Sequence, residues 1–591
     1  MRSLTRTYAA NAALLLGSAG RYWRWRLATA DVEAAQRRVL RRILRRNART
    51  AFGREHSFDR INSAAEYRRS VPLRSYEDFA PYVERMASGE SDVLTSGPVL
   101  MFERSSGSAS ASKLIPYTAA LKDEFQRGID PWLYSLYTSH PRLLAGRQYW
   151  SITPPAAEKQ YTAGGVPVGF EEESEYFGPL KRFIVRSLMA VPSAASQIRG
   201  GETFRYVTLR FLLQCRDLAF VSVWNPTFLT LLLDALPREA DRLLADLARG
   251  TLTPPGGLEP HLRSGLEPFL VRDERRAREL SQIFKARRSC SPLKPDGAGR
   301  TLFEALWPRL ALISCWADGS AREYALGLRD YFPGVPIQPK GLLATEGFVS
   351  FPASGGAGAA LSLRSHFFEF MEAEGLARDR RTRLAHELAR GGTYSVVMTT
   401  AGGLYRYRLH DLVRVTGFIK ECPVLQFLGR EDGVTDLCGE KLNESHVRKV
   451  VCERLAASRL RPSFFLLAPD GGAGRPPHYT LFVELEPGEA GSDGARLGGL
   501  SEALDEGLQE NPNYRNCRAL GQLARPRVFL IAGGEVRARE LFLSACGAMG
   551  QRLGNIKPTF LHAHRHWAGV FPGSYVEEAT GLPGRTRPAR F

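Results

Sequence analysis

Ser105-Ser106-Gly107-Ser108-Ala109-Ser110-Ala111-Ser112-Lys113 is a run of small residues that ends in a lysine. A predicted strand at residues 99–102 precedes this run, and an amphipathic pattern typical of a helix covers residues 118–139 after it. Small residues let backbone N–H groups approach a ligand closely, and the hydroxyls and the lysine add donors and positive charge. The run is therefore typical of a loop that holds a polyphosphate. The alternative is a flexible Ser/Ala linker, but such linkers seldom separate an apolar strand from an amphipathic helix.

Length and composition predict a protein of two or more domains. The chain has 591 residues, of which 44% are hydrophobic and 24% charged, and both fractions are ordinary for a soluble protein. The net charge of +18 raises the alternative of an anionic partner such as nucleic acid or a membrane surface. Arginine is spread along the whole chain, so we interpret this charge as a surface bias and expect no nucleic-acid partner. Only 11 residues are lysine, so a lysine inside a candidate site carries more weight.

Cysteine spacing and hydropathy bear on the compartment. No two of the eight cysteines form a Cys-x-x-Cys pair, which argues against a zinc site or a disulfide framework and fits a reducing compartment. The apolar run at residues 9–16 is too short to span a bilayer, and arginines follow it closely, which argues against a signal peptide. We therefore expect a cytoplasmic protein without a transmembrane segment.

The middle of the chain alternates strand-like apolar runs with helical patterns, which predicts a mostly parallel sheet with covering helices. The runs cover residues 149–153, 220–224, 310–316 and 335–338. Ligands of such sheets bind at the loops that leave the strand ends. Residues 394–427 are β-rich. We predict an α/β fold: a large N-terminal domain, 1–428, of mostly parallel sheets with covering helices and a β-rich subdomain, and a small mobile α+β C-terminal domain, 429–591.

Further motifs with charged side chains follow the phosphate loop in a fixed order. They are Ala344-Thr345-Glu346-Gly347, Tyr407-Arg408-Leu409-His410-Asp411, Gly429-Arg430-Glu431-Asp432 with Gly439-Glu440-Lys441, and Lys557 near the end. The sequence contains no Walker lysine motif, nucleophile elbow, HExxH helix or complete GxGxxG fingerprint. In this order the motifs resemble those of the adenylate-forming superfamily, which includes acyl-CoA synthetases and luciferase.

Within that superfamily the sequence most resembles the Gretchen Hagen family, the auxin-responsive acyl-acid amido synthetases. The likeness covers nearly the whole chain and includes residues 52–56, 115–118, 365–370 and 411–417. It implies a ligase that adenylates a hydrophobic carboxylic acid with ATP, transfers the acyl group to an amine such as an amino acid, and releases AMP and pyrophosphate. Two alternatives stay open: transfer to a thiol such as coenzyme A, and a non-catalytic scaffold. The oligomeric state stays open too.

The resemblance also implies a role for each motif. The ATP phosphates would bind to Ser105, Ser106, Gly107, Ser108 and Lys113. Glu346 would act in catalysis by holding Mg2+. The adenine and ribose would lie against Asp318, Gly319, Ser320, Ala344, Thr345 and Asp411. Lys557 would stabilise charge as the acyl carboxylate attacks phosphorus, and the C-terminal domain would swing about a hinge at Arg430 and Asp432 to deliver it.

The sequence departs from the family pattern at three positions. Leu342 stands where an aromatic residue usually stacks on adenine, His410 replaces the glycine before the ribose aspartate, and Ala109 replaces a hydroxyl residue of the phosphate loop. The acyl pocket is predicted beside the 118–139 helix, lined by Phe125, Leu133, Tyr134, Val168 and Phe170. Such lining suits a hydrophobic acid, and plain core packing is the alternative for each of these side chains.

Overall fold

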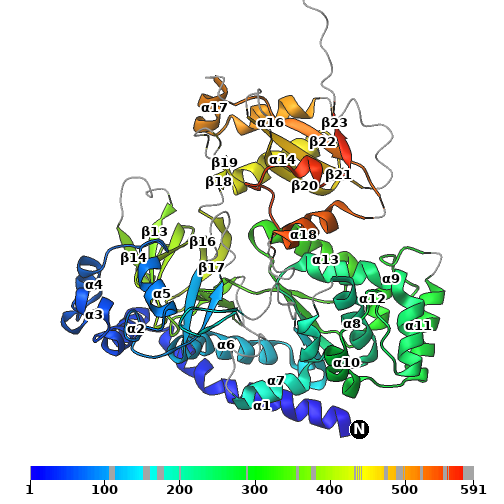
Figure 1. The fold of residues 1–591 in the computed structure, drawn as a ribbon, viewed down its shortest axis with the longest axis horizontal. Helices are drawn as coiled ribbons and strands as arrows, with labels where there is room; N and C mark the ends of the chain where they lie inside the picture. Colours follow the sequence, from blue (N-terminus) through cyan, green and yellow to red (C-terminus); the bar gives the residue numbers. More distant parts are fainter. Residues whose placement is uncertain are drawn as a thin grey trace, which may run out of the picture. The chain divides into compact units, whose positions relative to one another are not determined.

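Most of the chain lies in helices and strands of a computed structural model (Figure 1). The structure describes residues 2–104, 113–150, 160–169, 179–198, 201–287, 290–353, 358–373, 381–431, 434–435, 437, 440, 442–470, 477–486, 497, 499–519, 523–534, 536–549, 556 and 558–576. The chain divides into two compact units. One consists of residues 1–428 and 550–557, and the other of residues 429–549 and 558–591.

Two helices open the first unit. α1 (Arg2–Ala28) has no counterpart among the sequence-based predictions, and its buried Asn11 accepts a hydrogen bond from Tyr137 OH at 2.8 Å. α2 (Val32–Asn47) begins after Asp31, whose side chain caps the helix by accepting from a backbone N–H of its first turn. Three shorter helices follow, α3 (Ala51–Glu55), α4 (Ala64–Ser70) and α5 (Ala80–Ala87).

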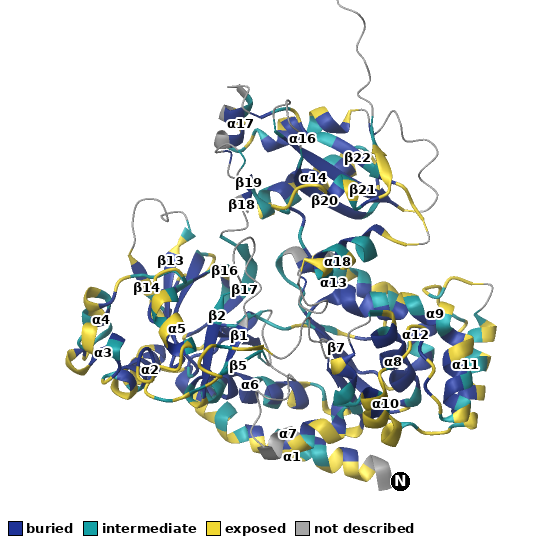
Figure 2. Ribbon diagram, viewed as in Figure 1, coloured by how far each residue is buried: buried dark blue, intermediate teal, exposed yellow. Residues whose placement is uncertain are grey.

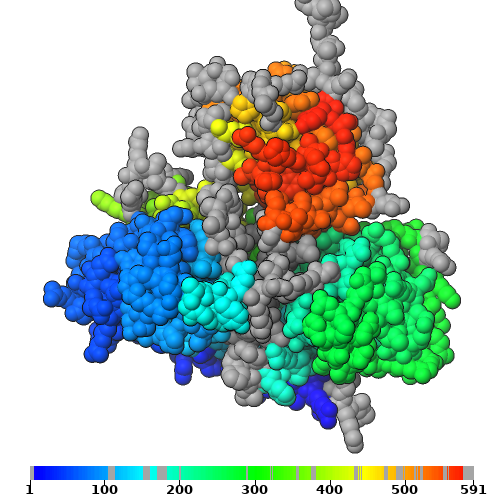
Figure 3. Space-filling model, viewed as in Figure 1, coloured from blue at the N-terminus to red at the C-terminus, as the bar shows by residue number. Residues whose placement is uncertain are grey.

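A four-stranded parallel sheet confirms the alternation predicted for the middle of the chain. Its order is β3-β6-β7-β8, with bounds β3 (Arg147–Trp150), β6 (Leu218–Ser222), β7 (Leu312–Cys315) and β8 (Ile337–Pro339). The helices of this region are α7 (Pro179–Leu188), α8 (Gly201–Gln214), α9 (Pro226–Arg249), α10 (Pro260–Leu266), α11 (Glu274–Ala286), α12 (Leu302–Leu306) and α13 (Arg322–Tyr331). Several of them share a hydrophobic core with the sheet, and Figure 2 shows β7 buried and α11 partly exposed. Figure 3 shows much of this stretch of chain as one continuous surface region, in green.

The β-rich region is an antiparallel sheet of seven strands in the order β11-β12-β17-β16-β15-β13-β14. Its strands are β11 (Ser350–Pro352), β12 (Ala359–Leu361), β13 (Phe367–Glu372), β14 (Thr382–Leu384), β15 (Thr393–Thr399), β16 (Tyr407–Ile419) and β17 (Cys422–Arg430). A separate two-stranded hairpin is formed by β9 (Leu343–Ala344) and β10 (Gly347–Phe348). The predicted α/β class with a β-rich subdomain is therefore confirmed.

The phosphate loop predicted at residues 105–113 connects two paired strands. β1 (Val99–Arg104) and β2 (Leu114–Thr118) pair antiparallel, and a small sheet continues with β5 (Pro167–Val168) and β4 (Gln160–Tyr161). α6 (Ala119–Ser139) follows β2 directly. The Thr118 side chain caps this helix by accepting a hydrogen bond from the Leu121 N–H. The helix predicted at 118–139 is confirmed, and the structure adds β2 between it and the loop.

The second unit has the predicted α+β composition. Its sheet has the order β20-β21-β22-β23, formed by β20 (Pro462–Asp470), β21 (His478–Leu485), β22 (Arg527–Ile531) and β23 (Gly573–Tyr575). A short pair of strands, β18 (Val434–Thr435) and β19 (Leu442–Asn443), precedes it. The helices are α14 (Glu444–Ala457), α16 (Leu500–Leu508), α17 (Pro512–Ala519) and α18 (Ala538–Ala548). Across the described part of the chain, no helix is long and apolar enough to cross a membrane.

Candidate active site

Glu346 stands on the turn of the β9–β10 hairpin. Ala344 pairs with Gly347, so Thr345 and Glu346 form the turn between the two strands. Tyr407 OH, at the start of β16, donates to Glu346 Oε1 at 3.3 Å. Glu346 is 8% exposed, so its carboxylate is held by the fold in a mostly desolvated position.

Other side chains clamp the hairpin from two sides. Tyr117 OH donates to the backbone carbonyl of Thr345 at 2.6 Å. On the other side, the Phe348 N–H donates to His366 Nε2 at 3.0 Å. Because Nε2 accepts this bond, the ring proton lies on Nδ1, which donates to Glu124 Oε2 at 3.0 Å. Glu124 and His366 are both buried, so their pairing anchors the strand that leaves the Glu346 turn.

Two glycines let α6 and the hairpin approach this closely. A Cβ at Gly128, on α6, would lie 2.2 Å from Cδ1 of Phe348. A Cβ at Gly347 would lie 2.2 Å from Cε of Met398 and 2.8 Å from Nε2 of His366. Real side chains do not tolerate such contacts. The absence of a side chain at both positions therefore sets the depth at which the Glu346 turn lies.

Lys113, the end of the predicted phosphate loop, lies beside Tyr76. Its Nζ is 5.4 Å from the ring centroid of Tyr76, and Tyr76 OH accepts from the Leu114 N–H at 2.8 Å. Burial raises the pKa of Tyr76, and nearby carboxylates that include Glu346 add to the rise. Tyr76 thus links the end of the loop to the neighbourhood of Glu346.

Asp411, predicted to bind ribose, is buried on a bulge of β16. The register of the β15–β16 pair shifts between Ser395 and Val397, which places His410 and Asp411 in the irregular part of the strand. His410 has a φ of 61°, in the left-handed region. This backbone conformation explains the glycine that the family pattern has there, and histidine is among the residues that adopt it more readily than most. Bulges of this kind often aim a side chain next to an active site.

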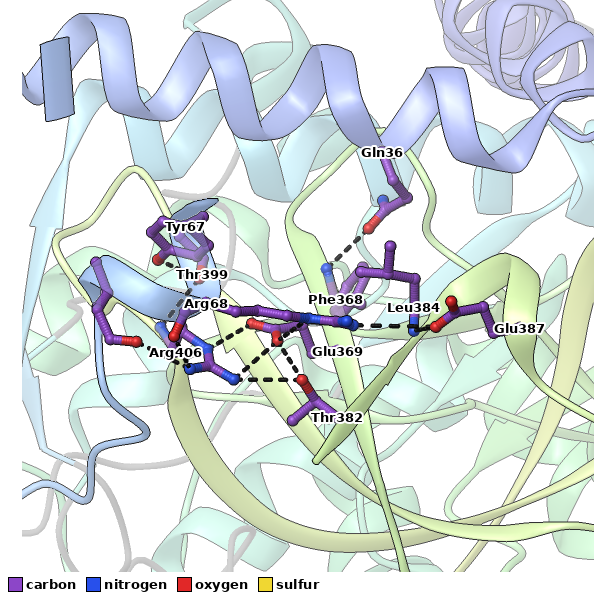
Figure 4. Close-up of polar contacts among 11 residues, drawn as sticks. Gln36, Tyr67, Arg68, Phe368, Glu369, Thr382, Leu384, Glu387, Thr399 and Arg406 are labelled. Atoms are coloured by element: carbon purple, nitrogen blue, oxygen red, sulfur yellow. Dashed lines mark hydrogen bonds and ion pairs between the residues drawn. The ribbon is translucent and has the colours of Figure 1, made fainter. Parts of the chain in front are cut away.

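A buried ion pair holds the start of β16 (Figure 4). Arg406 Nε and Nη2 donate to the two carboxylate oxygens of Glu369 at 2.9 and 3.0 Å, a bidentate geometry. Thr382 Oγ1 also donates to Glu369 at 2.5 Å. Arg406 directly precedes Tyr407, so this network fixes the backbone from which Tyr407 reaches Glu346.

The predicted adenine loop follows β7. Gly319 has a φ of 57°, and a Cβ there would lie 3.2 Å from the ring of Phe427 on β17. Burial raises the pKa of Asp318, and a hydrogen bond with the Gln426 side chain opposes the rise. The Ser320 backbone lies in the short helix η6 (Gly319–Ala321), and its side chain is outside the described part of the structure. The loop therefore lies against the end of β17.

The residues predicted for the acyl pocket lie in different surroundings. Phe125 is buried beside Tyr117, Phe348 and His366, with ring centroids 5.7 to 6.4 Å apart. Leu133 is fully buried in the main core, and Tyr134 stacks on Tyr22 of α1 at 4.3 Å. Val168, in β5, pairs with Phe102 of β1. Phe125 thus lies next to the Glu346 hairpin, and Tyr134 lies against α1; the acyl pocket stays a prediction.

Several predicted site residues lie outside the described residues. These are Ser105, Ser106, Gly107, Ser108, Phe170, Asp432 and Lys557. Arg430 is the last residue of β17. The segment 550–557 belongs to the first unit, and the backbone carbonyl of Ile556 accepts a hydrogen bond from Asn225 Nδ2 just after β6.

Sequence reasoning assigned no role to several residues of this site. Tyr117, His366 and Tyr407 occur within the family-like stretches, but no pattern of the sequence indicates their contacts. Glu124 is a carboxylate three residues after Leu121, inside the apolar stripe of α6. An acid in such a stripe is a detectable sign of a buried partner, but the sequence does not say which residue the partner is.

A divalent cation would find one oxygen ligand on the turn. Among the described residues, no group of three or more His, Cys, Asp or Glu side chains could hold a metal by itself. Mg2+ usually binds through one or two carboxylates together with substrate phosphates and water. Glu346 alone therefore fits a magnesium ion that arrives with a nucleotide, and does not fit a permanent protein-bound metal centre.

Comparison with known proteins agrees with this architecture. The fold is that of an acyl acid amido synthetase. A solved structure, titled AtGH3.15 acyl acid amido synthetase in complex with 2,4-DB, matches this chain with a TM-score of 0.79 and 21% sequence identity. The match covers 94% of this chain and 95% of that one. Models of the GH3 family match residues 23–337 (N-terminal domain), 359–430 (central domain) and 445–565 (C-terminal domain). The chain belongs to the GH3 family, which is the Gretchen Hagen family that the sequence resembles, so that resemblance is confirmed.

Two curated relatives illustrate the similarity. An indole-3-acetic acid-amido synthetase, GH3.8 of Oryza sativa subsp. indica, is 29% identical over 518 residues, covering 83% of this chain and 82% of the relative. The indole-3-acetic acid-amido synthetase GH3.2 of Arabidopsis thaliana is 25% identical over 484 residues, covering 77% and 85%.

Proposed function

We propose that this protein is an ATP-dependent acyl-acid amido synthetase. It adenylates a carboxylic acid and transfers the acyl group to an amine such as an amino acid. In the first step a carboxylate oxygen attacks the α-phosphorus of ATP and pyrophosphate leaves. In the second step the amine attacks the acyl carbon, AMP leaves, and the amine loses a proton. No covalent enzyme intermediate is required.

The observation that carries this proposal is the clamped Glu346 turn. Tyr117, His366 and Tyr407 hold the hairpin from three different parts of the chain, and each contact is a hydrogen bond of 2.6 to 3.3 Å. Such preorganisation has a purpose when a carboxylate must present its oxygen to a charged ligand in one position. Mg2+, brought by ATP and held by Glu346, would neutralise charge on the departing pyrophosphate.

The remaining residues fit the other parts of the nucleotide. Lys113 ends the loop that is proposed to hold the phosphates, and its ammonium group lies 5.4 Å from the ring centroid of Tyr76. Asp411, on its bulge, is proposed to accept hydrogen bonds from the ribose hydroxyls. Asp318 and Gly319 are proposed to flank the adenine. Leu342 is buried in the main core, so stacking on adenine by that position is not part of the proposal.

Lys557 is proposed to stabilise charge on the reacting oxygens. Its neighbour Ile556 accepts a hydrogen bond from buried Asn225, which caps α9 directly after β6 of the parallel sheet. Ligands of such sheets bind at the carboxyl ends of the strands, so this contact supports a place for Lys557 at that edge. A hinge at Arg430 and Asp432 is proposed to let the C-terminal domain deliver the lysine.

Exchange of pyrophosphate into ATP tests the first step without knowledge of the amine. Purified protein is supplied with Mg2+, ATP, labelled pyrophosphate and a panel of carboxylic acids. We expect exchange that depends on the acid and falls by at least 100-fold in Glu346→Gln, because transition-state charge stabilisation by one group is worth about 10² or more in rate. The matched control, Glu202→Gln, removes an exposed carboxylate on α8 and should leave exchange unchanged.

Product analysis then distinguishes the acceptors. Incubation with the active acid and either a mixture of amino acids or coenzyme A gives an amide or a thioester, which mass spectrometry separates. An amide supports the proposal, and a thioester alone replaces it with an acyl-CoA ligase. If no acid supports exchange and calorimetry shows no ATP binding, the protein is a non-catalytic member of the family.

A further inference from the structure

Helix α1 has polar residues on its buried face and large apolar residues on its exposed face. Asn11 and Ser18 are fully buried. Leu16, Trp23 and Leu27, by contrast, are 73%, 55% and 72% exposed. Figure 2 shows exposed stretches along much of this helix. Packing on the first unit accounts for the buried face, but it gives the exposed apolar face no role.

The exposed residues form one continuous apolar face. They recur every three or four residues, which places them on the same side of the helix, and none of them is charged. They are Ala9, Ala13, Leu16, Gly20, Trp23 and Leu27. At a rise of about 1.5 Å per residue, this face is about 27 Å long. Because surface helices usually turn charged residues to the solvent, such a face is suited to a further apolar contact.

Arginines gather beside α1, around Arg364. This residue lies in the segment between β12 and β13, and two helices contact that segment. Trp25 Nε1, on α1, donates to the backbone carbonyl of Leu361 at 3.1 Å. Arg42 Nη2, on α2, donates to the backbone carbonyl of Ser365 at 3.2 Å. The two helices therefore bring their arginines towards Arg364.

Positive charge accumulates at this point. Burial and the charges of four neighbouring arginines lower the pKa of Arg364 to about 10. The neighbours, which together with Arg364 form the arginine cluster, are Arg127 of α6, Arg24 of α1, and Arg42 and Arg38 of α2. Arg24 directly follows Trp23, so the cluster borders the apolar face. An anion bound among these side chains relieves their mutual repulsion.

Two carboxylates of α6 in this area are already paired. Asp123 lies 2.7 Å from a nitrogen of Arg21 and 2.6 Å from one of Arg127. Glu124 is buried against His366. Within the part of the chain that the structure describes, three members of the cluster form no ion pair, namely Arg24, Arg38 and Arg364. The cluster therefore has positive charge to offer to a partner.

Charge complementarity selects one class of partner. In an anionic lipid bilayer, phosphates pair with the arginines, and the apolar face enters the boundary between headgroups and acyl chains, where tryptophan is favoured. A nucleic acid pairs with arginine but leaves the leucines in water. A second copy of the chain, related by a twofold axis, places the same arginines against one another.

We propose that α1 and the arginine cluster attach this protein to the surface of an anionic membrane, with α1 lying in the plane of the interface. The helix rests on the bilayer and does not cross it, in agreement with its length and apolar content among the described helices. This attachment does not depend on the proposed adenylation, because none of the residues of α1 belongs to the proposed reaction centre.

Sedimentation with sucrose-loaded vesicles tests this inference. The purified chain is mixed with vesicles of phosphatidylcholine alone, or with vesicles that contain about one third phosphatidylserine. We expect binding to the anionic vesicles at about 0.1 M salt, where charges act over about 10 Å, and weaker binding at about 1 M salt. Binding to the neutral vesicles should be at least about tenfold weaker, because each arginine near an anionic surface contributes about fivefold in affinity.

Two double variants separate the contributions of charge and of apolar area. Arg24→Gln with Arg38→Gln should weaken binding to the anionic vesicles by about 30-fold. Leu16→Gln with Leu27→Gln should weaken it by at least about tenfold, because less apolar area leaves water.

The matched controls change exposed residues on other elements. Arg329→Gln with Arg515→Gln removes the same charge from α13 and α17, and Leu326→Gln with Leu293→Gln replaces two exposed leucines away from α1. Both controls should bind the anionic vesicles within about twofold of the wild type, since charges beyond a Debye length are screened.

Four outcomes overturn the inference. The first is no binding to the anionic vesicles or equal binding to both kinds, and the second is unchanged binding in either of the two α1 variants. The third is DNA binding with a steep salt dependence in a protein that binds no vesicles, which assigns the arginine cluster to nucleic acid. The fourth is a dimer, seen by light scattering, that binds no vesicles and dissociates in the leucine variant, which assigns the apolar face to a second copy of the chain.

Discussion

His366 offers the sharpest test of how the Glu346 turn is held. The ring uses its two nitrogens differently: Nδ1 donates to Glu124 and Nε2 accepts from the Phe348 N–H, both at 3.0 Å. Asparagine places a donor near the position of Nδ1, and glutamine places an acceptor near the position of Nε2. His366→Asn therefore keeps the link to Glu124 and breaks the link to the hairpin, and His366→Gln does the reverse.

The two variants should lose similar amounts of stability. An unsatisfied buried N–H costs about 1–3 kcal/mol, and a lost hydrogen bond to a charged group about 1.5–3 kcal/mol. The first unit has roughly 430 residues, so its entropy of unfolding is about 0.9 kcal/mol per kelvin. A loss of about 2 kcal/mol then lowers Tm by only about 2 °C in either variant. At 25 °C both proteins remain folded, and their activities can be compared directly.

Activity should separate them. When the Phe348 amide loses its acceptor, the strand after Glu346 can shift, and a misplacement of about 1 Å costs on the order of 100-fold in rate. We expect His366→Asn to lose about 10- to 100-fold in pyrophosphate exchange and to need more Mg2+, while His366→Gln stays near the wild type. Equal losses in both variants, or a larger loss in His366→Gln, would refute the claim that His366 acts through the hairpin.

Three further substitutions test other parts of the structure. Gly128→Ala should lower the free energy of unfolding by about 1–3 kcal/mol and slow pyrophosphate exchange, because the new Cβ meets Phe348. Gly327 is the control: it is a helical glycine, and a Cβ there would meet nothing within 4 Å. Gly327→Ala should therefore raise the free energy of unfolding, measured with denaturant, by about 0.5–1 kcal/mol. His410→Gly should leave the free energy of unfolding within about 1 kcal/mol of the wild type, since glycine adopts the φ of 61° freely. His410→Val should lower it by about 1–3 kcal/mol, because a β-branched residue is strained at this φ. Equal stabilities of the two variants would contradict this backbone strain. Burial beside aromatic rings and the charge of His564 lower the pKa of His562 to about 4 in the folded protein. As the pH falls from about 6.5 to 4, this histidine is therefore protonated in the unfolded state but still neutral in the folded state. The second unit should therefore lose up to about 3 kcal/mol of stability over that range, and His562→Gln should flatten the pH dependence of its thermal unfolding.

Local sequence determined the elements around the site. The spacing of Leu121, Phe125 and Ile129 predicted α6 almost to its ends, and the apolar run at residues 310–316 predicted β7. The order of the motifs identified the family before any contact was known. These properties depend on side chains a few positions apart, whose periodicity reflects the face that each element buries.

The departures have physical reasons. The sequence shows residues 394–427 only as β-rich. In the structure β16 is one strand with a bulge, because pairing with β15 continues past the left-handed His410. α1 was missed, because its apolar residues do not follow a single stripe. Leu133 lies in the main core and Tyr134 stacks on Tyr22 of α1, and their place in the acyl pocket stays a prediction.

The sequence by itself determined the fold class and the family, and it predicted the charged residues that are proposed for the chemistry. Only the tertiary structure decided how those residues are held. Glu124 and His366 are 242 positions apart, and Tyr407 and Glu346 are 61 positions apart. Periodicity and spacing report the neighbours of a residue along the chain. Contacts between distant segments depend on strand order and on close approaches such as that of Gly128, which no local pattern records.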